Sequence, residues 1–159
     1  MIKYLIMDVD GTLTDGKIYM SSDGEMFKAF DIKDGCGIRD ILPENGIIPV
    51  IITARDSKIL ENRCKELSIE KLYQGERNKI GRLKEILQEE GADLSACAYI
   101  GDDILDIQCM NPIKEAGGRI GCPADAVKQV KDLADFISSK NGGDGAVREF
   151  IEWLVDGEQ

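Results

Sequence analysis

Residues 2–15 read IKYLIMDVDGTLTD, an apolar run followed at once by acidic residues and a glycine. The short run at 2–7 is typical of a buried strand. Side chains two apart on an extended chain point to the same side, so Asp8 and Asp10 would face one site just beyond that strand. Gly11 would let the backbone turn sharply out of the sheet. The stretch therefore predicts an acidic site at the end of a buried strand.

The rest of the chain alternates short apolar runs with longer amphipathic segments, with no repeats and no low-complexity linker. Further strands are expected at 47–53, 71–73, 97–100, 118–121 and 135–137, and a hairpin with strands at 17–20 and 26–30 around a turn at 21–24. Helices are expected at 36–42, 58–67, 79–90, 104–111, 124–132 and 147–155, with Pro43 and Pro112 ending two of them. This alternation predicts an α/β fold with a parallel sheet covered by helices on both faces. We expect one domain over 1–159, with a hairpin insertion at about 16–30 and a C-terminal loop and helix at about 141–156.

Three of the expected strands end in polar or acidic groups: Asp8, Thr53, and Asp102 with Asp103. Ligands of such sheets bind at the carboxyl ends of the strands, so these side chains are expected to converge. Neighbouring carboxylates repel each other, and a structure tolerates them best with a cation between them. The alternative for the Asp8 and Asp10 pair alone is a solvated acidic turn after an edge strand.

The net charge and the amino-acid composition exclude several classes of partner and mechanism. The net charge is −10, which disfavours nucleic acid as a partner and would repel an anionic substrate unless a divalent cation and local basic residues intervened. The chain has no histidine, which removes the serine–histidine and cysteine–histidine hydrolase mechanisms. Acid–base chemistry would fall to carboxylates, lysine or water.

The location is expected to be cytoplasmic. No apolar run reaches the length of a membrane span, and the start of the sequence shows no pattern of a secretory leader, so we expect no membrane partner. The five cysteines form no C-x-x-C pair, and their odd number argues against a full disulfide framework. We expect reduced, mostly buried thiols.

Four motifs in order resemble those of the haloacid dehalogenase-like (HAD) phosphatases. Residues 8–14, DVDGTLT, resemble the first motif of that superfamily, and Thr53 at the end of a strand resembles the second. Lys79 at the start of a helix resembles the third-motif lysine, and residues 101–106, GDDILD, resemble the acidic fourth motif. The resemblance covers essentially the whole chain and implies a Rossmann-like HAD fold.

The resemblance implies a phosphoric monoester hydrolase with Asp8 as the nucleophile that forms an aspartyl phosphate. Asp10 would protonate the leaving oxygen and later activate water. Thr53 and Lys79 would hold the phosphoryl oxygens on which negative charge accumulates. The implied catalytic residues are therefore Asp8, Asp10, Thr53 and Lys79.

The implied cofactor is Mg²⁺. Its ligands would be the Asp8 carboxylate, the Asp10 backbone carbonyl and Asp102, while Asp103 and Asp106 would support these ligands from behind. Carboxylate, carbonyl and water ligands favour Mg²⁺ over zinc.

Only a hairpin fits between the first motif and the next helix, so no large cap domain is expected. The sequence is similar to the 3-deoxy-D-manno-octulosonate 8-phosphate (KDO8P) phosphatases of lipopolysaccharide biosynthesis and their sialic-type relatives, in residues 8–16, 30–35, 52–55, 72–75 and 142–149. This similarity implies a sugar acid phosphate as substrate. It also implies a homotetramer in which the hairpins form a central barrel and a neighbouring subunit covers each site.

Two arginines bear on the substrate. Arg55 is predicted to pair with a substrate carboxylate, because octulosonate-type enzymes resemble this chain in having arginine there, whereas a nononate-type relative has glutamate. Ala54 departs from the T-G-R sequence that is usual in the relatives. Arg148, in the C-terminal segment, is the second predicted substrate contact. The alternatives are a surface charge for Arg55 and a linker to a packing helix for the segment that carries Arg148.

Three other functions compete with hydrolysis of the eight-carbon substrate. The first is a phosphatase for a nononate or sialic-type 9-phosphate. The second is a silent oligomerisation module like the C-terminal domains of sialic acid cytidylyltransferases, although the full set of acids argues against a relic site. The third is a receiver domain, which fits the placement of Asp8 and Thr53 poorly.

Overall fold

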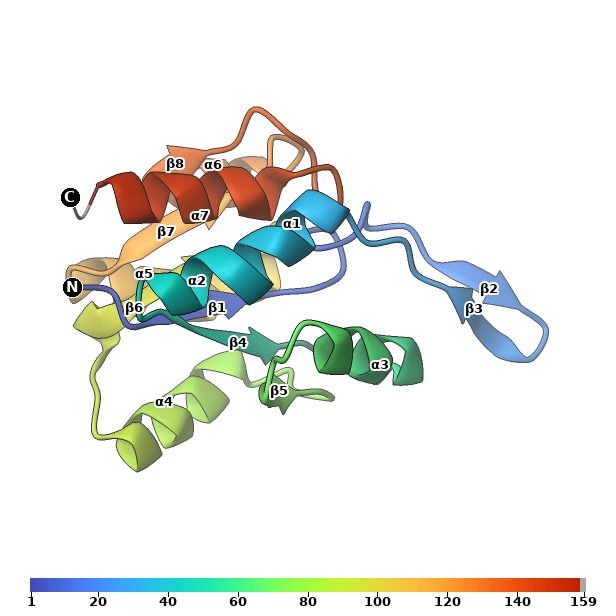
Figure 1. Ribbon diagram of the computed structural model, residues 1–159, viewed down its shortest axis with the longest axis horizontal. Helices are drawn as coiled ribbons and strands as arrows, with labels where there is room; N and C mark the ends of the chain where they lie inside the picture. Colours follow the sequence, from blue (N-terminus) through green and yellow to red (C-terminus); the bar gives the residue numbers. More distant parts are fainter. Residues whose placement is uncertain (158–159) are drawn as a thin grey trace.

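The computed structural model describes residues 1–157. Its main sheet has six parallel strands in the order β5-β4-β1-β6-β7-β8 (Figure 1). The predicted parallel α/β sheet is confirmed. The strands, in sheet order, are Lys71–Tyr73, Ile48–Ile52, Tyr4–Met7, Cys97–Ile100, Arg119–Cys122 and Phe136–Ile137.

Helices cover both faces of the sheet, because side chains of each buried strand alternate between two apolar clusters. On β1, Leu5 and Met7 pack into one cluster, and Tyr4 and Ile6 pack into the other. The first cluster takes in the π-helical η1 (Gly37–Ile41), α2 (Leu42–Glu44), α3 (Lys58–Glu66) and α7 (Ala146–Asp156), and α1 (Ile32–Cys36) leads directly into η1 and contacts α7. The second takes in α4 (Lys79–Glu90), α5 (Ile104–Glu115) and α6 (Lys128–Leu133), and the short 3₁₀ helix η2 (Leu94–Ala96) precedes β6.

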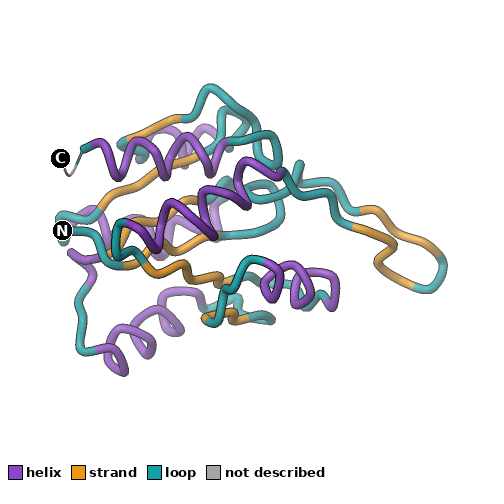
Figure 2. The backbone as a smooth tube through the Cα atoms, viewed as in Figure 1, coloured by secondary structure: helices purple, strands orange, loops and turns teal. Residues whose placement is uncertain are grey.

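The hairpin consists of β2 (Tyr19–Ser21) and β3 (Gly24–Phe27) and projects away from the sheet (Figures 1 and 2). Its turn is tighter than the predicted one at 21–24, because Ser21 pairs with Gly24 and only two residues lie between them. Gly24 has a φ of 115°, which a side chain would disfavour. In the described chain, this hairpin is the only sheet inserted between β1 and the first helix.

Both prolines were predicted to end helices. The first helix was expected to stop near Pro43 and ends one residue later, at Glu44, whereas the prediction that Pro112 ends a helix was wrong. The first helical stretch begins after Asp31, which caps it, and runs past Pro43 to Glu44. Just before Pro43, the Leu42 N–H donates to the Gly37 carbonyl in a wide π turn, which gives room to a residue that cannot donate. In α5 the helix continues beyond Pro112 to Glu115, because the next turn is anchored by the fully buried Ile113.

The helix predicted at 124–132 is shorter than expected and starts at Lys128. The residues before it use their N–H groups for contacts elsewhere in the fold. Ala124 donates to the Lys140 carbonyl at 2.8 Å, and Val127 donates to the Asp102 carbonyl at 2.9 Å. Among the described residues, no helix combines the length and the hydropathy needed to cross a bilayer.

Candidate active site

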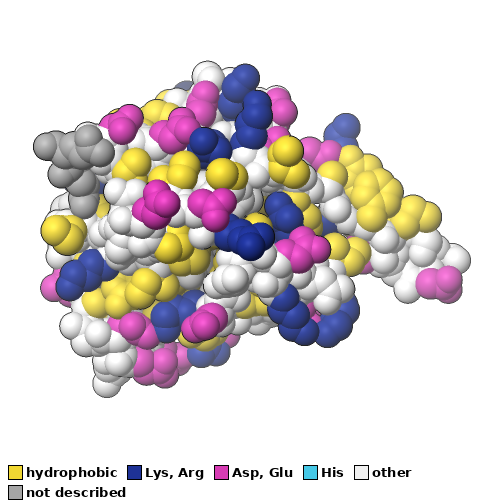
Figure 3. All heavy atoms as spheres, viewed as in Figure 1, with side chains coloured by type: hydrophobic (Ala, Val, Ile, Leu, Met, Phe, Trp, Pro, Cys, Tyr) yellow, Lys and Arg dark blue, Asp and Glu magenta, His cyan; other side chains and the backbone are white. Residues whose placement is uncertain are grey.

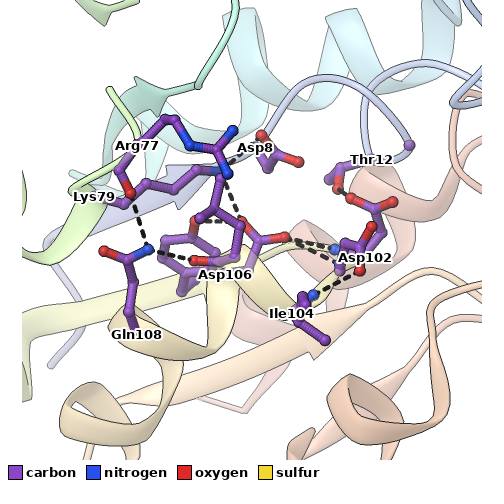
Figure 4. Close-up of polar contacts among 12 residues, drawn as sticks. Asp8, Thr12, Arg77, Lys79, Asp102, Ile104, Asp106 and Gln108 are labelled. Carbon is purple, nitrogen blue, oxygen red and sulfur yellow. Dashed lines mark hydrogen bonds and ion pairs between the residues drawn. The ribbon is translucent and has the colours of Figure 1, made fainter. Parts of the chain in front are cut away.

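The acidic side chains meet at the carboxyl ends of the two central strands, β1 and β6. Asp8 follows β1 directly, and its N–H donates to the Ile100 carbonyl of β6 at 3.1 Å. Asp102 lies two residues beyond the end of β6. One carboxylate oxygen from each of Asp8, Asp102 and Asp106 can be chosen so that all three lie within 4.8 Å of one another. The tips of separate strands therefore bring several acids to one point (Figure 4).

Lys79 reaches this cluster from the first turn of α4. Its side chain is almost fully buried, and its ammonium donates to Asp8 Oδ1 at 2.9 Å and to Asp106 Oδ1 at 2.8 Å. Burial would lower the pKa of Lys79, but the two carboxylates outweigh this effect and raise it, so the ammonium stays charged. The Asn78 side chain caps the helix by accepting from the Gly81 N–H, which fixes where Lys79 emerges.

Asp106 organises the cluster from behind. Besides Lys79, its Oδ1 accepts from the Tyr99 hydroxyl at 2.6 Å. Its Oδ2 accepts from the backbone N–H groups of Asp102 at 3.0 Å and Asp103 at 3.2 Å. Both oxygens of Asp106 are thus occupied, whereas Asp103 is exposed and caps α5 through the Ile104 N–H.

The cluster holds more negative charge than Lys79 can neutralise. Burial, followed by the charge of Asp106, raises the pKa of Asp8 to about 6. Burial, followed by the charges of Asp8 and Asp106, raises the pKa of Asp102 to about 8. One oxygen each of Asp8, Asp102 and Asp106 could hold a cation, and oxygen ligands of this kind suit a hard divalent ion.

The loop after Asp8 fits closely around Asp102. Thr12 Oγ1 donates to Asp102 Oδ1 at 3.2 Å, and Gly11, with a φ of 89°, leaves room for the carboxylate. A Cβ at residue 11 would lie 1.9 Å from Asp102 Oδ2. Asp10 is half-buried, and its carboxylate binds the Lys28 ammonium at 2.7 Å rather than the Asp8 cluster.

Thr53 and Arg55 line the same cleft, which has a volume of about 180 Å³ and also includes the acids named above and Lys79. Thr53 is buried at the end of β4. Its N–H donates to the Tyr73 carbonyl, and its carbonyl accepts from the Glu76 N–H, both at 3.0 Å. Arg55 is exposed at the rim of the cleft.

Arg148 does not reach the cleft of its own chain. Its guanidinium donates to Glu152 Oε1 at 2.7 Å and to the Lys33 carbonyl at 3.3 Å. The glycine loop before α7 does reach the site, since the Gly143 N–H donates to the Thr12 carbonyl at 3.2 Å. The predicted contact of Arg148 with substrate therefore stays a prediction.

Sequence reasoning missed three residues that shape the site: Lys28, Tyr99 and Thr12. Strand alternation would have placed Tyr99 on the face that α4 and α5 cover, but not against Asp106 in particular. Nothing in the spacing of Lys28 pointed to Asp10, because the hairpin brings together residues 18 positions apart.

The known proteins that are similar to this chain are phosphatases, which agrees with the acidic site described above. No family model matches the chain. The KdsC proteins of Salmonella typhi and Escherichia coli (strain K12), each named 3-deoxy-D-manno-octulosonate 8-phosphate phosphatase, are 42% identical over 154 residues, which is 97% of this chain and 79% of each relative.

Solved structures give the same result. That of the KDO8P phosphatase from Moraxella catarrhalis, in complex with a magnesium ion, a phosphate ion and KDO, has a TM-score of 0.89 and 39% identity, covering 98% of this chain and 86% of that one. The structure of a putative HAD superfamily hydrolase from Legionella pneumophila has a TM-score of 0.91 and 32% identity, covering 99% and 84%. The matches cover 97–99% of this chain and 79–86% of the relatives, and on this basis the protein belongs to the KDO8P phosphatase family of HAD superfamily hydrolases.

Proposed function

We propose that this protein is a Mg²⁺-dependent phosphatase that hydrolyses 3-deoxy-D-manno-octulosonate 8-phosphate. The observation that carries the proposal is the convergence of Asp8, Lys79 and Asp102 at the ends of β1 and β6. A relative of 39% identity was solved with magnesium, phosphate and KDO, which supports the same cofactor and product for this chain.

In the proposed reaction a carboxylate oxygen of Asp8 attacks phosphorus, and the bond from phosphorus to the sugar oxygen breaks. Asp10 gives its proton to the departing oxygen, leaving an aspartyl phosphate on Asp8. Asp10 then takes a proton from the water that cleaves this acyl phosphate, which regenerates both acids. Lys79 and Thr53 hold the phosphoryl oxygens through both steps. Mg²⁺, held by Asp8, Asp102 and the Asp10 carbonyl, would neutralise charge on the phosphoryl group.

Substrate choice rests on Arg55. The guanidinium is exposed at the rim of the cleft, and its planar fork suits a carboxylate. An arginine at this position, as in octulosonate-type enzymes, favours the eight-carbon sugar acid. A nononate 9-phosphate is the alternative substrate, and a silent assembly module is the alternative without catalysis.

Phosphate release, measured across KDO 8-phosphate, nononate 9-phosphates and hexose phosphates with Mg²⁺, tests the proposal. We expect the highest kcat/KM with KDO 8-phosphate, and Asp8→Asn should lower it by more than about 10³-fold. Arg55→Ala should lower turnover of the sugar acid more than that of an aryl phosphate. A preference for the 9-phosphates would favour the alternative substrate. A folded protein without turnover of any substrate would favour the assembly module.

We also propose that four copies assemble through the hairpin. It exposes apolar side chains at 43–65% of their area, which Figure 3 shows gathered on the projecting arm: Ile18, Met20, Met26 and Phe27. An isolated two-stranded hairpin is marginal in water, and exposed apolar surface of this kind is typical of an interface.

Light scattering after size-exclusion chromatography measures the assembly. Met20→Glu with Met26→Glu should convert the tetramer into smaller species, whereas Asp23→Lys in the turn should not. A wild-type monomer, or a tetramer that persists in the double variant, would contradict the hairpin interface.

A cytoplasmic location completes the proposal. All five cysteines are unpaired, and four of them are buried, which suits a reducing compartment: Cys64, Cys97, Cys109 and Cys122. Immunodetection in fractionated source cells should find the protein with cytoplasmic markers, and recovery with periplasmic markers would contradict this location.

A further inference from the structure

Lys28, just after β3, is a half-buried cation that the proposed reaction does not use. Its side chain is 5% exposed, and its ammonium lies 2.7 Å from Asp10 Oδ1 and 2.9 Å from Glu25 Oε1. Among the described residues, Lys28 is the one side chain that donates to the Asp10 carboxylate.

Glu25, the second acid that binds Lys28, is itself held by the loops that carry the second and third motifs. Glu25 Oε2 accepts from Ser57 Oγ at 2.6 Å. Ser57 caps α3 through the Leu60 N–H, and its own N–H donates to Gln74 Oε1 at 2.7 Å. The Glu25 carboxylate that binds Lys28 is therefore held by residues outside the hairpin.

We propose that Lys28 is a positioning residue that fixes the Asp10 carboxylate for proton transfer to the leaving oxygen. This inference rests on the proposed function. The side chain of Asp10 is 22% exposed, so without a partner its carboxyl group would rotate between staggered rotamers, including ones that point away from the leaving group. Proton transfer by a placed side chain contributes about 10²–10⁴-fold, and misplacement loses part of that factor.

A purely structural role for Lys28, tying the hairpin to the domain, makes a different prediction. Loss of structure would slow every substrate alike. Loss of a positioned acid would slow substrates in proportion to how much their leaving group needs a proton. An alkyl phosphate such as KDO 8-phosphate needs protonation, whereas p-nitrophenyl phosphate has a leaving group that departs without it.

The experiment compares kcat on these two substrates for Lys28→Met and Lys28→Arg. We expect Lys28→Met to lose at least about 10-fold on KDO 8-phosphate and less than about 3-fold on p-nitrophenyl phosphate. Lys28→Arg, which keeps the cation, should recover most of the loss. Lys17→Met removes an exposed lysine from the same hairpin and should match the wild type. In an Asp10→Asn background, Lys28→Met should add no further loss on KDO 8-phosphate.

Equal losses on the two substrates, or additive losses in the Asp10→Asn background, would overturn the inference. Failure of the proposed function would look different, because the wild type itself would then fail to release phosphate from KDO 8-phosphate. Thermal unfolding of each variant monitors folding. If Lys28→Met does not fold because Asp10 and Glu25 repel each other, Glu25→Gln combined with Lys28→Met relieves the repulsion and gives the same comparison.

Discussion

At the scale of single residues, Gly11 shows how tightly the site is built. Its φ of 89° lies in the left-handed region that side chains disfavour. The space where a Cβ would stand holds Asp102 Oδ2, and on the other side the Gly142 backbone lies so close that a Cβ there would be 2.0 Å from the Gly11 carbonyl. The Asp102 carboxylate and the Gly142 backbone therefore both pack against Gly11, where a side chain would not fit.

Gly11→Ala is expected to lower both stability and turnover. The left-handed backbone alone costs about 1–2 kcal/mol, and the added methyl displaces Asp102. Urea unfolding and phosphate release measure the two effects.

Gly46→Ala is the matched control, since Gly46 has a φ of 69° and nothing within 4 Å of the added Cβ. It should lose only the about 1–2 kcal/mol of the left-handed backbone while keeping kcat. Full activity in Gly11→Ala would contradict the close fit around Asp102.

At the scale of elements, the start of α7 is capped by another helix. The N-cap residue Gly145 offers no side chain, and Asp34 of α1 instead accepts from the Arg148 N–H at 2.9 Å. Asp34 is 2% exposed, and its Oδ2 has no hydrogen-bond partner. Burial, with the nearby charges of Asp31 and Asp144, raises the pKa of Asp34 to about 6, although the N–H groups of α7 oppose this shift.

This cap predicts a pH dependence of stability. Because the pKa of Asp34 rises from 3.8 to about 6 on folding, the protonated form stabilises the fold below pH 3.8, and this contribution is lost as the pH rises through about 6. Its size is on the order of 3 kcal/mol. Asp34→Asn should match the wild type near pH 4 and exceed its free energy of unfolding near pH 7, as measured by urea titration.

Asp40→Asn changes an exposed acid of the same helical stretch and should leave the pH profile unaltered. Parallel profiles for the wild type and Asp34→Asn would show that Asp34 does not titrate in this range.

At the scale of the whole molecule, two features favour the binding of a divalent cation. They are the net charge of −10 and the cluster of acids at the strand ends. A divalent cation relieves local repulsion in the cluster and lowers the barrier that the field of the protein presents to an anionic substrate.

Mg²⁺ is therefore expected to stabilise the fold as well as to support turnover. At a concentration 100 times its Kd, it should add about 2.7 kcal/mol to the free energy of unfolding. Thermal unfolding with Mg²⁺, with EDTA and with NaCl at equal ionic strength measures this effect. Asp102→Asn should remove the Mg²⁺ increment, and an equal effect of NaCl would reduce it to ionic screening.

The comparison of sequence with structure follows the same scales. The run at 2–7 and the acids after it predicted β1 and the edge at which the site lies, because apolar runs and strand ends are local patterns. Pro112 was misjudged, since the packing of the buried Ile113 outweighs what proline dictates locally. The hydrogen-bond partners of Asp106 and Asp10 could not be predicted from the sequence, because they depend on which segments meet in space.

The sequence by itself determined the parallel α/β sheet, the acids at its carboxyl edge and the membership of the family, because periodicity and motif order are written along the chain. Only the tertiary structure decided which partner each acid has. Asp102 accepts from the Thr12 hydroxyl, Asp106 is held by Lys79 and Tyr99, and Asp10 is held by Lys28. Those assignments depend on contacts between residues far apart in sequence, and distances of a few ångströms decide them.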